Sequence, residues 1–188
     1  MIRPNIIKII CHDIGKHLGC YGIKSVNTNS IDSLAKDGIL FNNAFATSPG
    51  CSPRRAAIAT GRYPHNTGVL GLAHAHFGWS LDKKIKHIAK YFSSNDYNSI
   101  LFGLQHVTYH EKTLGFKKIF PERPADHVIK NIEDNLDAIL FKKPFYAEVN
   151  FFEPHRPFDF GGVKSYRSKG VFIPKYIPNN SNIKKEFE

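Results

Sequence analysis

The sequence predicts an α/β protein with a mostly parallel central sheet flanked by helices. Two patterns support this class: short runs rich in β-branched residues alternate with helical patterns, and polar residues follow the runs. The chain has 188 residues, 41% of them hydrophobic, which is enough for one domain with a sizeable core. No internal repeat and no second domain are evident, and no apolar run approaches the roughly 20 residues that span a bilayer.

The first expected element is a strand over residues 6–11. Its residues form an apolar, mostly β-branched run, the pattern of a strand buried on both faces. The strand leads into His12 and Asp13. Ligand sites in open α/β sheets lie at this carboxyl edge, so these two polar residues are candidates for a site.

Three elements are expected next along the chain. Apolar residues at helical spacing predict a helix over residues 30–36, with Gly38 as its stop. Residues 39–46 are then predicted to form a short strand. A second helix is expected to begin just after Cys51, because Pro53 suits a first helical turn, where its missing N–H costs nothing.

The rest of the chain continues the alternation of helices and strands. The predicted elements are an amphipathic helix over 83–92, a strand over 99–103, a helix over 128–140 and a buried strand over 145–151. Histidines follow both strands, at His106 and His155. No closing strand is predicted after residue 174.

The composition limits the partners and the compartment. Cys11, Cys20 and Cys51 are too few for a disulfide framework, so free thiols are expected. A net charge of +10 favours anionic partners, but the basic residues are spread along the chain. We therefore expect a solvated basic surface and no nucleic-acid groove. The start of the chain is typical of a first strand and not of a signal peptide, which predicts a cytoplasmic protein without membrane attachment.

Cys51 is the residue with the most reactive predicted surroundings. At a helix N-terminus beside Arg54 and Arg55, its thiolate would be stabilised by the helix dipole and the guanidiniums. The same surroundings favour tetrahedral oxyanions such as sulfate or phosphate. The alternative from composition alone is a buried structural cysteine beside two surface arginines.

A family resemblance favours the reactive reading. Cys51-Ser52-Pro53-Arg54-Arg55, followed by Thr60-Gly61, resembles the signature of the type I sulfatases, Cys-x-Pro-Ser-Arg followed by Thr-Gly. Arg54 stands where the family usually has Ser. Other similar segments are Pro4-Asn5-Ile6-Ile7, Leu18-Gly19-Cys20-Tyr21-Gly22, residues 30–45 and residues 61–69. The resemblance implies an alkaline-phosphatase-like fold.

Two further segments resemble the heparan N-sulfatase (sulfamidase) branch in particular. They are Gly103-x-x-His106-Val107 and Phe152-Glu153-Pro154-His155-Arg156. The resemblance covers roughly residues 4 to 178, and within the family it covers only the N-terminal part of the catalytic domain. It implies that residues 1–188 are a partial, incomplete catalytic domain, and that a C-terminal half is a possible missing partner.

The resemblance implies a role for each candidate site residue. Cys51 would be oxidised by a formylglycine-generating maturation enzyme, and the hydrated aldehyde would attack the sulfur of a sulfated carbohydrate. Arg55 would hold the hydrate and the sulfate. Asp13 would ligate a divalent cation, usually calcium, with His12 and the modified Cys51 beside it. His106 and His155 would lie around the sulfate and leaving group, as acid or base.

Three departures from the family pattern bear on this interpretation. The metal pair, usually Asp-Asp, is His12-Asp13, and imidazole is a poor calcium ligand, so a softer ion is an alternative. Leu104 replaces a lysine of the sulfate pocket. No segment after His155 resembles the later Asp-Asn pair that completes the metal site.

Two other functions remain open from the sequence. One is a phosphoester or phosphonate hydrolase of the same superfamily, because sulfate and phosphate differ mainly in charge. The other is a non-catalytic anion-binding protein that keeps the sulfate cradle without turnover.

Overall fold

The computed structural model describes residues 3–74, 76, 78–140, 144–158, 160 and 172–187. The chain divides into two compact units, one formed by Met1–His12 with Phe45–Glu153, and the other by Asp13–Ala44 with Pro154–Glu188. The first unit contains the sheet and is the larger of the two.

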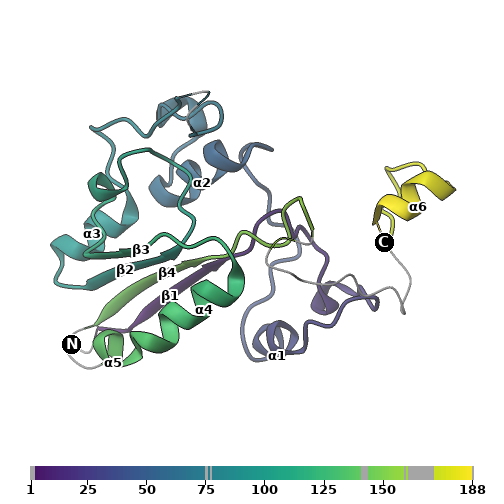
Figure 1. Cartoon of the computed structure of the whole chain (residues 1–188), viewed down its shortest axis with the longest axis horizontal. Helices are drawn as coiled ribbons and strands as arrows, with labels where there is room; N and C mark the ends of the chain where they lie inside the picture. The colour runs from purple at the N-terminus through teal and green to yellow at the C-terminus, as the bar shows by residue number, and fades with distance from the viewer. Residues whose placement is uncertain are drawn as a thin grey trace. The chain divides into compact units, whose positions relative to one another are not determined.

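The first unit is built on a four-stranded sheet with the strand order β1-β4-β2-β3 (Figure 1). The strands are β1 (Ile6–Ile10), β2 (Asn98–Gly103), β3 (Lys118–Phe120) and β4 (Phe145–Asn150). Every paired neighbour is parallel, which confirms the predicted class. The sequence predicted three of the strands and missed β3, because three residues are too short to show a period.

Helices pack against both faces of this sheet. They are α2 (Cys51–Thr60) and α3 (Ile88–Ser94) on one face, and α4 (Ala125–Asp134) and α5 (Leu136–Leu140) on the other (Figure 1). Parallel strands need crossover connections, and helices in those connections naturally cover the two faces.

Alternation along β2 divides the apolar core in two. Leu101 packs with Ala56 of α2 and Ala89 of α3. Its neighbours Ile100 and Phe102 point to the other face, into a second cluster formed with α4 and α5. Because successive side chains of a strand point to opposite faces, one continuous apolar run supplies both cores.

The first strand is less buried than its sequence predicts. Ile7 is 61% and Ile9 is 59% exposed, whereas Ile6 packs against the core beneath α2 and α3. The strand lies at the edge of the sheet, and the described members of the α4–α5 core come from β2 and β4 rather than β1. The expectation of burial on both faces was therefore wrong for one face.

The predicted helix over residues 83–92 begins later, at Ile88. The Asp82 side chain accepts a hydrogen bond from the Lys84 N–H at 2.8 Å, which turns the chain before the helix. His87 then caps α3, since its Nδ1 accepts from the Ala89 N–H at 3.1 Å. Local side-chain hydrogen bonds thus override the helical spacing.

The helix predicted over residues 128–140 is two helices, α4 and α5. Asn135 separates them: its side chain donates to the Asn131 carbonyl at 2.9 Å and its N–H to the Ile132 carbonyl at 3.1 Å. Val128 and Ile132 of α4 and Ile139 of α5 pack in the same core, whereas Ile129 and Leu136 of the predicted stripe are exposed.

The strand predicted over residues 39–46 does not form. Ile39 is 83%, Phe41 67% and Phe45 88% exposed, and no ladder partner for this segment lies among the described residues. Its β-branched and aromatic residues gave a strand pattern, but a strand needs a neighbour to pair with.

The second unit contains α1 (Asn29–Asp37) and α6 (Ser181–Phe187). The carboxylate of Asp32 in α1 accepts hydrogen bonds from the Cys20 N–H at 2.7 Å and the Thr28 hydroxyl at 3.0 Å, which fastens the loop before the helix. The sequence predicted α1 and gave no helix at α6. The structure confirms the three cysteines as free thiols.

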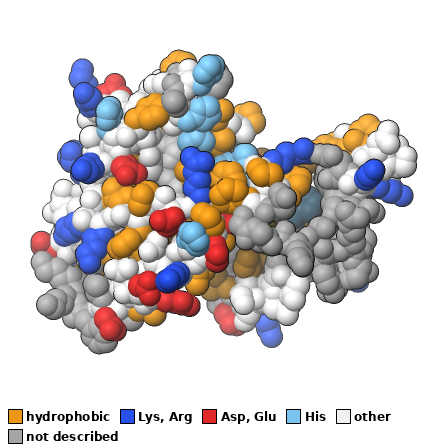
Figure 2. All heavy atoms as spheres, viewed as in Figure 1, with side chains coloured by type: hydrophobic (Ala, Val, Ile, Leu, Met, Phe, Trp, Pro, Cys, Tyr) orange, Lys and Arg blue, Asp and Glu red, His pale blue; other side chains and the backbone are white. Residues whose placement is uncertain are grey.

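The described residues show no membrane-spanning helix and a mixed surface charge. Among the described residues, no helix is both long and apolar enough to cross a membrane. On the face shown in Figure 2, lysine and arginine side chains are interspersed with acidic ones among the described atoms. This matches the dispersed charge read from the sequence.

Candidate functional site

The candidate site is organised around the N-terminus of α2. Cys51 is the first residue of this helix, one position earlier than predicted, and Pro53 lies in its first turn as expected. Gly61 ends the helix at φ +67°, and its N–H donates to the Ala57 carbonyl at 2.8 Å. The backbone N–H groups of the first turn have no carbonyl partner within the helix, so they favour negative charge near Cys51.

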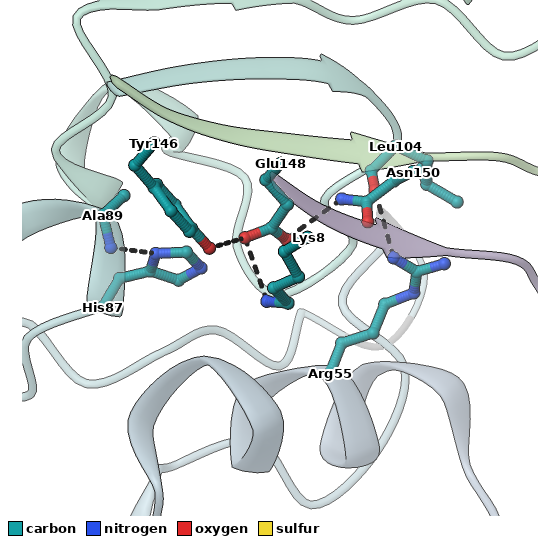
Figure 3. Close-up of polar contacts among 8 residues, drawn as sticks. All are labelled: Lys8, Arg55, His87, Ala89, Leu104, Tyr146, Glu148 and Asn150. Atoms are coloured by element: carbon teal, nitrogen blue, oxygen red, sulfur yellow. Dashed lines mark hydrogen bonds and ion pairs between the residues drawn. The ribbon is translucent and has the colours of Figure 1, made fainter. Parts of the chain in front are cut away.

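Arg55 lies one turn after Cys51 and is almost fully buried, with 3% exposure. One guanidinium nitrogen donates to the Leu104 carbonyl oxygen at 3.2 Å, which links α2 to the loop after β2 (Figure 3). A guanidinium held inside the protein is a fixed positive charge beside the helix N-terminus, which suits an oxyanion.

The loop after β2 gives His106 a defined position. His106 itself has φ +58°, a left-handed conformation that is uncommon outside glycine. Gln105 shapes the loop: its side-chain oxygen accepts from the Val107 N–H at 2.7 Å, and its side-chain nitrogen donates to the Thr108 carbonyl at 2.6 Å.

Three predicted site residues come together here. One ligand atom each of His12, Cys51 and His106 lies within 4.8 Å of the other two. His12 follows the end of β1, where its N–H donates to the Glu153 carbonyl at 3.1 Å and its ring contacts Phe152. The ends of two strands and the start of a helix therefore converge, as the rule for ligand sites in open sheets predicts.

His106 is neutral in this arrangement. Burial lowers its pKa to about 4, and the positive charge of Arg55 adds to the effect, followed by His74 and His12. The His74 ring stacks on that of His106 with centroids 5.7 Å apart. A neutral imidazole at pH 7 accepts a proton or binds a metal, and it carries no positive charge for a sulfate.

Asp13 and His155 belong to the second unit and pair with each other. His155 Nε2 lies 3.9 Å from Asp13 Oδ2. His155 Nδ1 lies 2.5 Å from the Arg156 carbonyl oxygen, and Asp13 has φ +54°. The roles of these two residues as metal ligand and as acid or base stay predictions.

A buried polar network under the sheet was missed by the sequence analysis. Lys8 of β1 and Glu148 of β4 are paired in register, and Lys8 Nζ lies 3.0 Å from Glu148 Oε2 (Figure 3). The Tyr146 hydroxyl donates to the same oxygen at 2.7 Å. Asn150 Nδ2 donates to Glu148 Oε1 at 3.1 Å. The available signal was one basic and one acidic residue, each inside an otherwise apolar strand.

The network extends toward the site through Asn150, the last residue of β4. Figure 3 shows Arg55 reaching from α2 toward this strand end, where Leu104 also lies. Burial alone would raise the pKa of Glu148, but Lys8, His87 and the two hydrogen bonds lower it below its ordinary value. Glu148 is therefore a carboxylate, which fixes the orientation of the Asn150 amide below Arg55.

His87, the buried histidine before α3, is expected to lower the free energy of unfolding in mild acid. Burial lowers the pKa of His87 to about 4, Glu148 opposes the shift, and Lys8 adds to it. As the pH falls, the unfolded chain protonates His87 at a higher pH than the folded chain does. The stability that neutral His87 contributes is therefore lost as pH falls from about 6.5 toward 4. We expect the His87 contribution to fall by about 2 kcal/mol between pH 7 and roughly pH 5.

Urea unfolding at both pH values measures this change. His87→Asn is the matched variant, because asparagine caps a helix well but does not titrate. Its stability loss over this interval is expected to be smaller than that of the unchanged chain. Equal losses in the two proteins would show that His87 is not the source.

The chain is similar to known sulfatases. The sulfatase family pattern matches residues 4–172. An ulvan-active sulfatase of Formosa agariphila is 32% identical over 188 aligned residues, which cover 97% of this chain and 35% of the relative. The chain thus spans about a third of that relative's length.

Solved structures show the same fold. A 2-O GAG sulfatase superposes with a TM-score of 0.67 at 25% identity, covering 92% of this chain and 40% of that one. A phosphonate monoester hydrolase of Agrobacterium radiobacter gives a TM-score of 0.66 at 24% identity, covering 82% of this chain and 42% of that one. This second likeness shows the fold alone. With a family match over most of its length and a cysteine, an arginine and two histidines gathered at one sheet edge, the chain belongs to the sulfatase family.

Proposed function

We propose that this chain hydrolyses a sulfate ester or an N-sulfate of a sugar, with a formylglycine made from Cys51 as the nucleophile. The observation that carries the proposal is the position of Cys51 as the first residue of α2, with the buried Arg55 one turn later. The family membership supports the same chemistry. In this proposal residues 1–188 are the N-terminal part of a sulfatase catalytic domain.

The site supplies charges for the proposed reaction. A hydroxyl of the hydrated aldehyde would form a bond to sulfur while the bond from sulfur to the sugar oxygen or nitrogen breaks. The proton of that hydroxyl would pass to solvent, and the leaving sugar atom would take a proton from solvent. The second hydroxyl of the hydrate would then lose its proton and expel sulfate, and a water molecule would rehydrate the aldehyde. Negative charge on the sulfate is stabilised by the N–H groups at the start of α2 and by Arg55. His106 lies beside Cys51, where its ring can contact the attacking hydroxyl or the leaving group.

The residues gathered around Cys51 do not fit calcium, the ion that the family resemblance implies. At its protein sites, calcium is usually bound by about six to eight oxygen ligands. The described cluster offers two imidazole nitrogens and one sulfur. Asp13 stays a predicted metal ligand.

The substrate class is proposed from relatives and from sequence. The Formosa relative is named for activity on ulvan, and we extend a sulfated carbohydrate substrate to this chain. The sequence segments around His106 and His155 favour N-sulfated sugars as a narrower class. A panel of sugars sulfated at nitrogen or at oxygen would separate the two.

The decisive experiment is expression of the chain with and without a formylglycine-generating enzyme. Mass spectrometry of the Cys51 peptide is expected to show the aldehyde only with the enzyme, and turnover of an aryl sulfate is expected to follow conversion. Cys51→Ala should show neither, whereas Cys20→Ser in the second unit should show both. A peptide that keeps its thiol in the presence of an active maturation enzyme would overturn the proposal.

An aryl phosphate in the same assay tests the second candidate function. The fold shared with a phosphonate monoester hydrolase keeps this chemistry open. Faster turnover of phosphate than of sulfate by the converted chain would favour the phosphoester reading. Complete conversion without turnover of either ester would favour a non-catalytic anion-binding protein.

A further inference from the structure

We propose that the unconverted chain binds a borderline-soft divalent cation such as Zn²⁺ through Cys51, His12 and His106. This site would exist only while Cys51 carries its sulfur. It shares His12 and Cys51 with the metal site that the family resemblance implies, but it uses His106 in place of Asp13 and the cysteine sulfur in place of the aldehyde. The inference concerns the thiol form of the protein and does not require the chain to be a sulfatase in its own right.

The geometry places three suitable donors together. One donor atom from each residue lies within 4.8 Å of the other two. In a tetrahedral zinc site, donors at about 2.0 to 2.3 Å from the metal lie roughly 3.3 to 3.7 Å apart. A contraction of at most about 1.5 Å therefore brings the three atoms to bonding distance.

The three residues are held by different parts of the fold, so the cluster is not an accident of one flexible loop. His12 is 1% exposed at the end of β1, Cys51 begins α2, and His106 lies on the loop that Gln105 fastens. The Nδ1 of His106 has no hydrogen-bond partner among the described residues. At least one ring nitrogen of His106 is therefore open to a ligand.

Donor chemistry selects the class of metal. Thiolate and imidazole favour zinc, copper and related ions, whereas calcium and magnesium prefer oxygen. Three protein donors leave a fourth position for water, the arrangement of an open zinc site. On binding, the Cys51 sulfur loses its proton to solvent and forms a bond to the metal, without any redox change.

Charge limits the affinity but does not forbid binding. Arg55 and the N-terminus of α2 carry positive charge, which lowers the affinity for a cation. The thiolate cancels one of the two positive charges of the ion.

The test is a metal titration of the full chain expressed without a maturation enzyme, with the Cys51 thiol verified by mass spectrometry. Zn²⁺ affinity is measured by competition with a chromophoric chelator, and Co²⁺ is used as a spectroscopic probe. We expect one ion per chain and a cobalt spectrum with a sulfur-to-metal charge-transfer band and the intense visible bands of tetrahedral coordination.

Matched variants decide whether the assigned residues are the ligands. Cys51→Ser and His106→Ala are each expected to weaken zinc binding by at least about a hundredfold, since even outer-shell changes cost about 10 to 100-fold. Cys20→Ser and His110→Ala, which lie outside the cluster, should bind as the unchanged chain does. Circular dichroism of every variant verifies that the fold is kept.

Three results would overturn the proposal. They are zinc binding unaffected by Cys51→Ser, a cobalt spectrum without the sulfur band, and loss of binding in the Cys20→Ser control. Each of these can occur whether or not Cys51 is later converted and turns over sulfate. Failure here is therefore distinguishable from failure of the proposed hydrolase function.

Discussion

Gly103→Ala is expected to lower the free energy of unfolding by about 3 kcal/mol or more, beyond the range of most single substitutions. Gly103 is the last residue of β2 and has φ +82°. A Cβ atom at this position would lie 1.9 Å from the Asn150 carbonyl oxygen on the neighbouring strand. Because that atom belongs to the backbone of β4, it cannot move aside without breaking the register of the sheet.

The substitution is also expected to displace His106. Gly103 is the register partner of Asn150, and the loop that carries His106 starts directly after it. Any shift that relieves the overlap moves the end of β2, and with it the histidine beside Cys51. Zinc binding by the thiol form should therefore fall in Gly103→Ala, even in the fraction that remains folded.

Gly61→Ala is the matched control for this prediction. Gly61 also has a positive φ, +67°, but a Cβ atom there would meet nothing within 4 Å. It therefore carries the same kind of backbone strain, about 1 kcal/mol, without the overlap. Urea unfolding of the two variants isolates the steric part. Equal losses of stability would contradict the overlap and leave only the cost of the left-handed backbone.

The glycine and cysteine positions show what the sequence could predict about the site. The edge of a parallel sheet was predictable because polar residues followed the apolar runs at His12 and His106, and Pro53 located the start of α2. The structure brings both histidines close to Cys51. Asp13 and His155, predicted for the same site, pair in the second unit, so their relation to Cys51 stays a prediction.

Contacts between distant segments could not be predicted in the same way. Lys8 and Glu148 meet across 140 positions of sequence, and their pairing depends on the register of β1 against β4, which no local pattern specifies. The strand expected over residues 39–46 failed for the related reason that local propensity does not supply a partner strand. Hydrophobic periodicity thus predicts elements, whereas register and edges follow from tertiary packing.

The buried ion pair gives the second large expected effect. Lys8→Met should lower the free energy of unfolding by about 3 kcal/mol, because removal of one partner leaves the other charge buried without compensation. The Glu148 side chain is 5% exposed, and among the described residues it keeps only the hydrogen bonds from Tyr146 and Asn150 in this variant. Glu148→Gln should cost less, about 2 kcal/mol, since the Lys8 side chain is 20% exposed and can retain water.

The double variant Lys8→Met with Glu148→Gln separates pairing from burial. Glutamine can still accept from the Tyr146 hydroxyl, and methionine fills the space of the lysine stem, so no charge is left buried. We expect the double variant to be more stable than Lys8→Met alone, with a coupling of about 1 to 3 kcal/mol by urea unfolding. Additive losses would mean that the two side chains contribute independently.

The same set of single and double variants tests whether the Lys8–Glu148 network also helps to position the residues around Cys51. Glu148 orients the Asn150 amide at the strand end toward which Arg55 reaches (Figure 3). If the carboxylate matters only for stability, the double variant should bind zinc as the unchanged chain does once its stability is restored. If it also positions Asn150 and Arg55, zinc binding should change in the double variant while its fold and stability remain close to those of the unchanged protein. In the double variant the single oxygen of glutamine accepts from the Tyr146 hydroxyl, so its NH2 group faces Asn150, whose amide can turn to accept with its oxygen. Because neither Asn150 nor Arg55 is a proposed zinc ligand, we expect the first outcome.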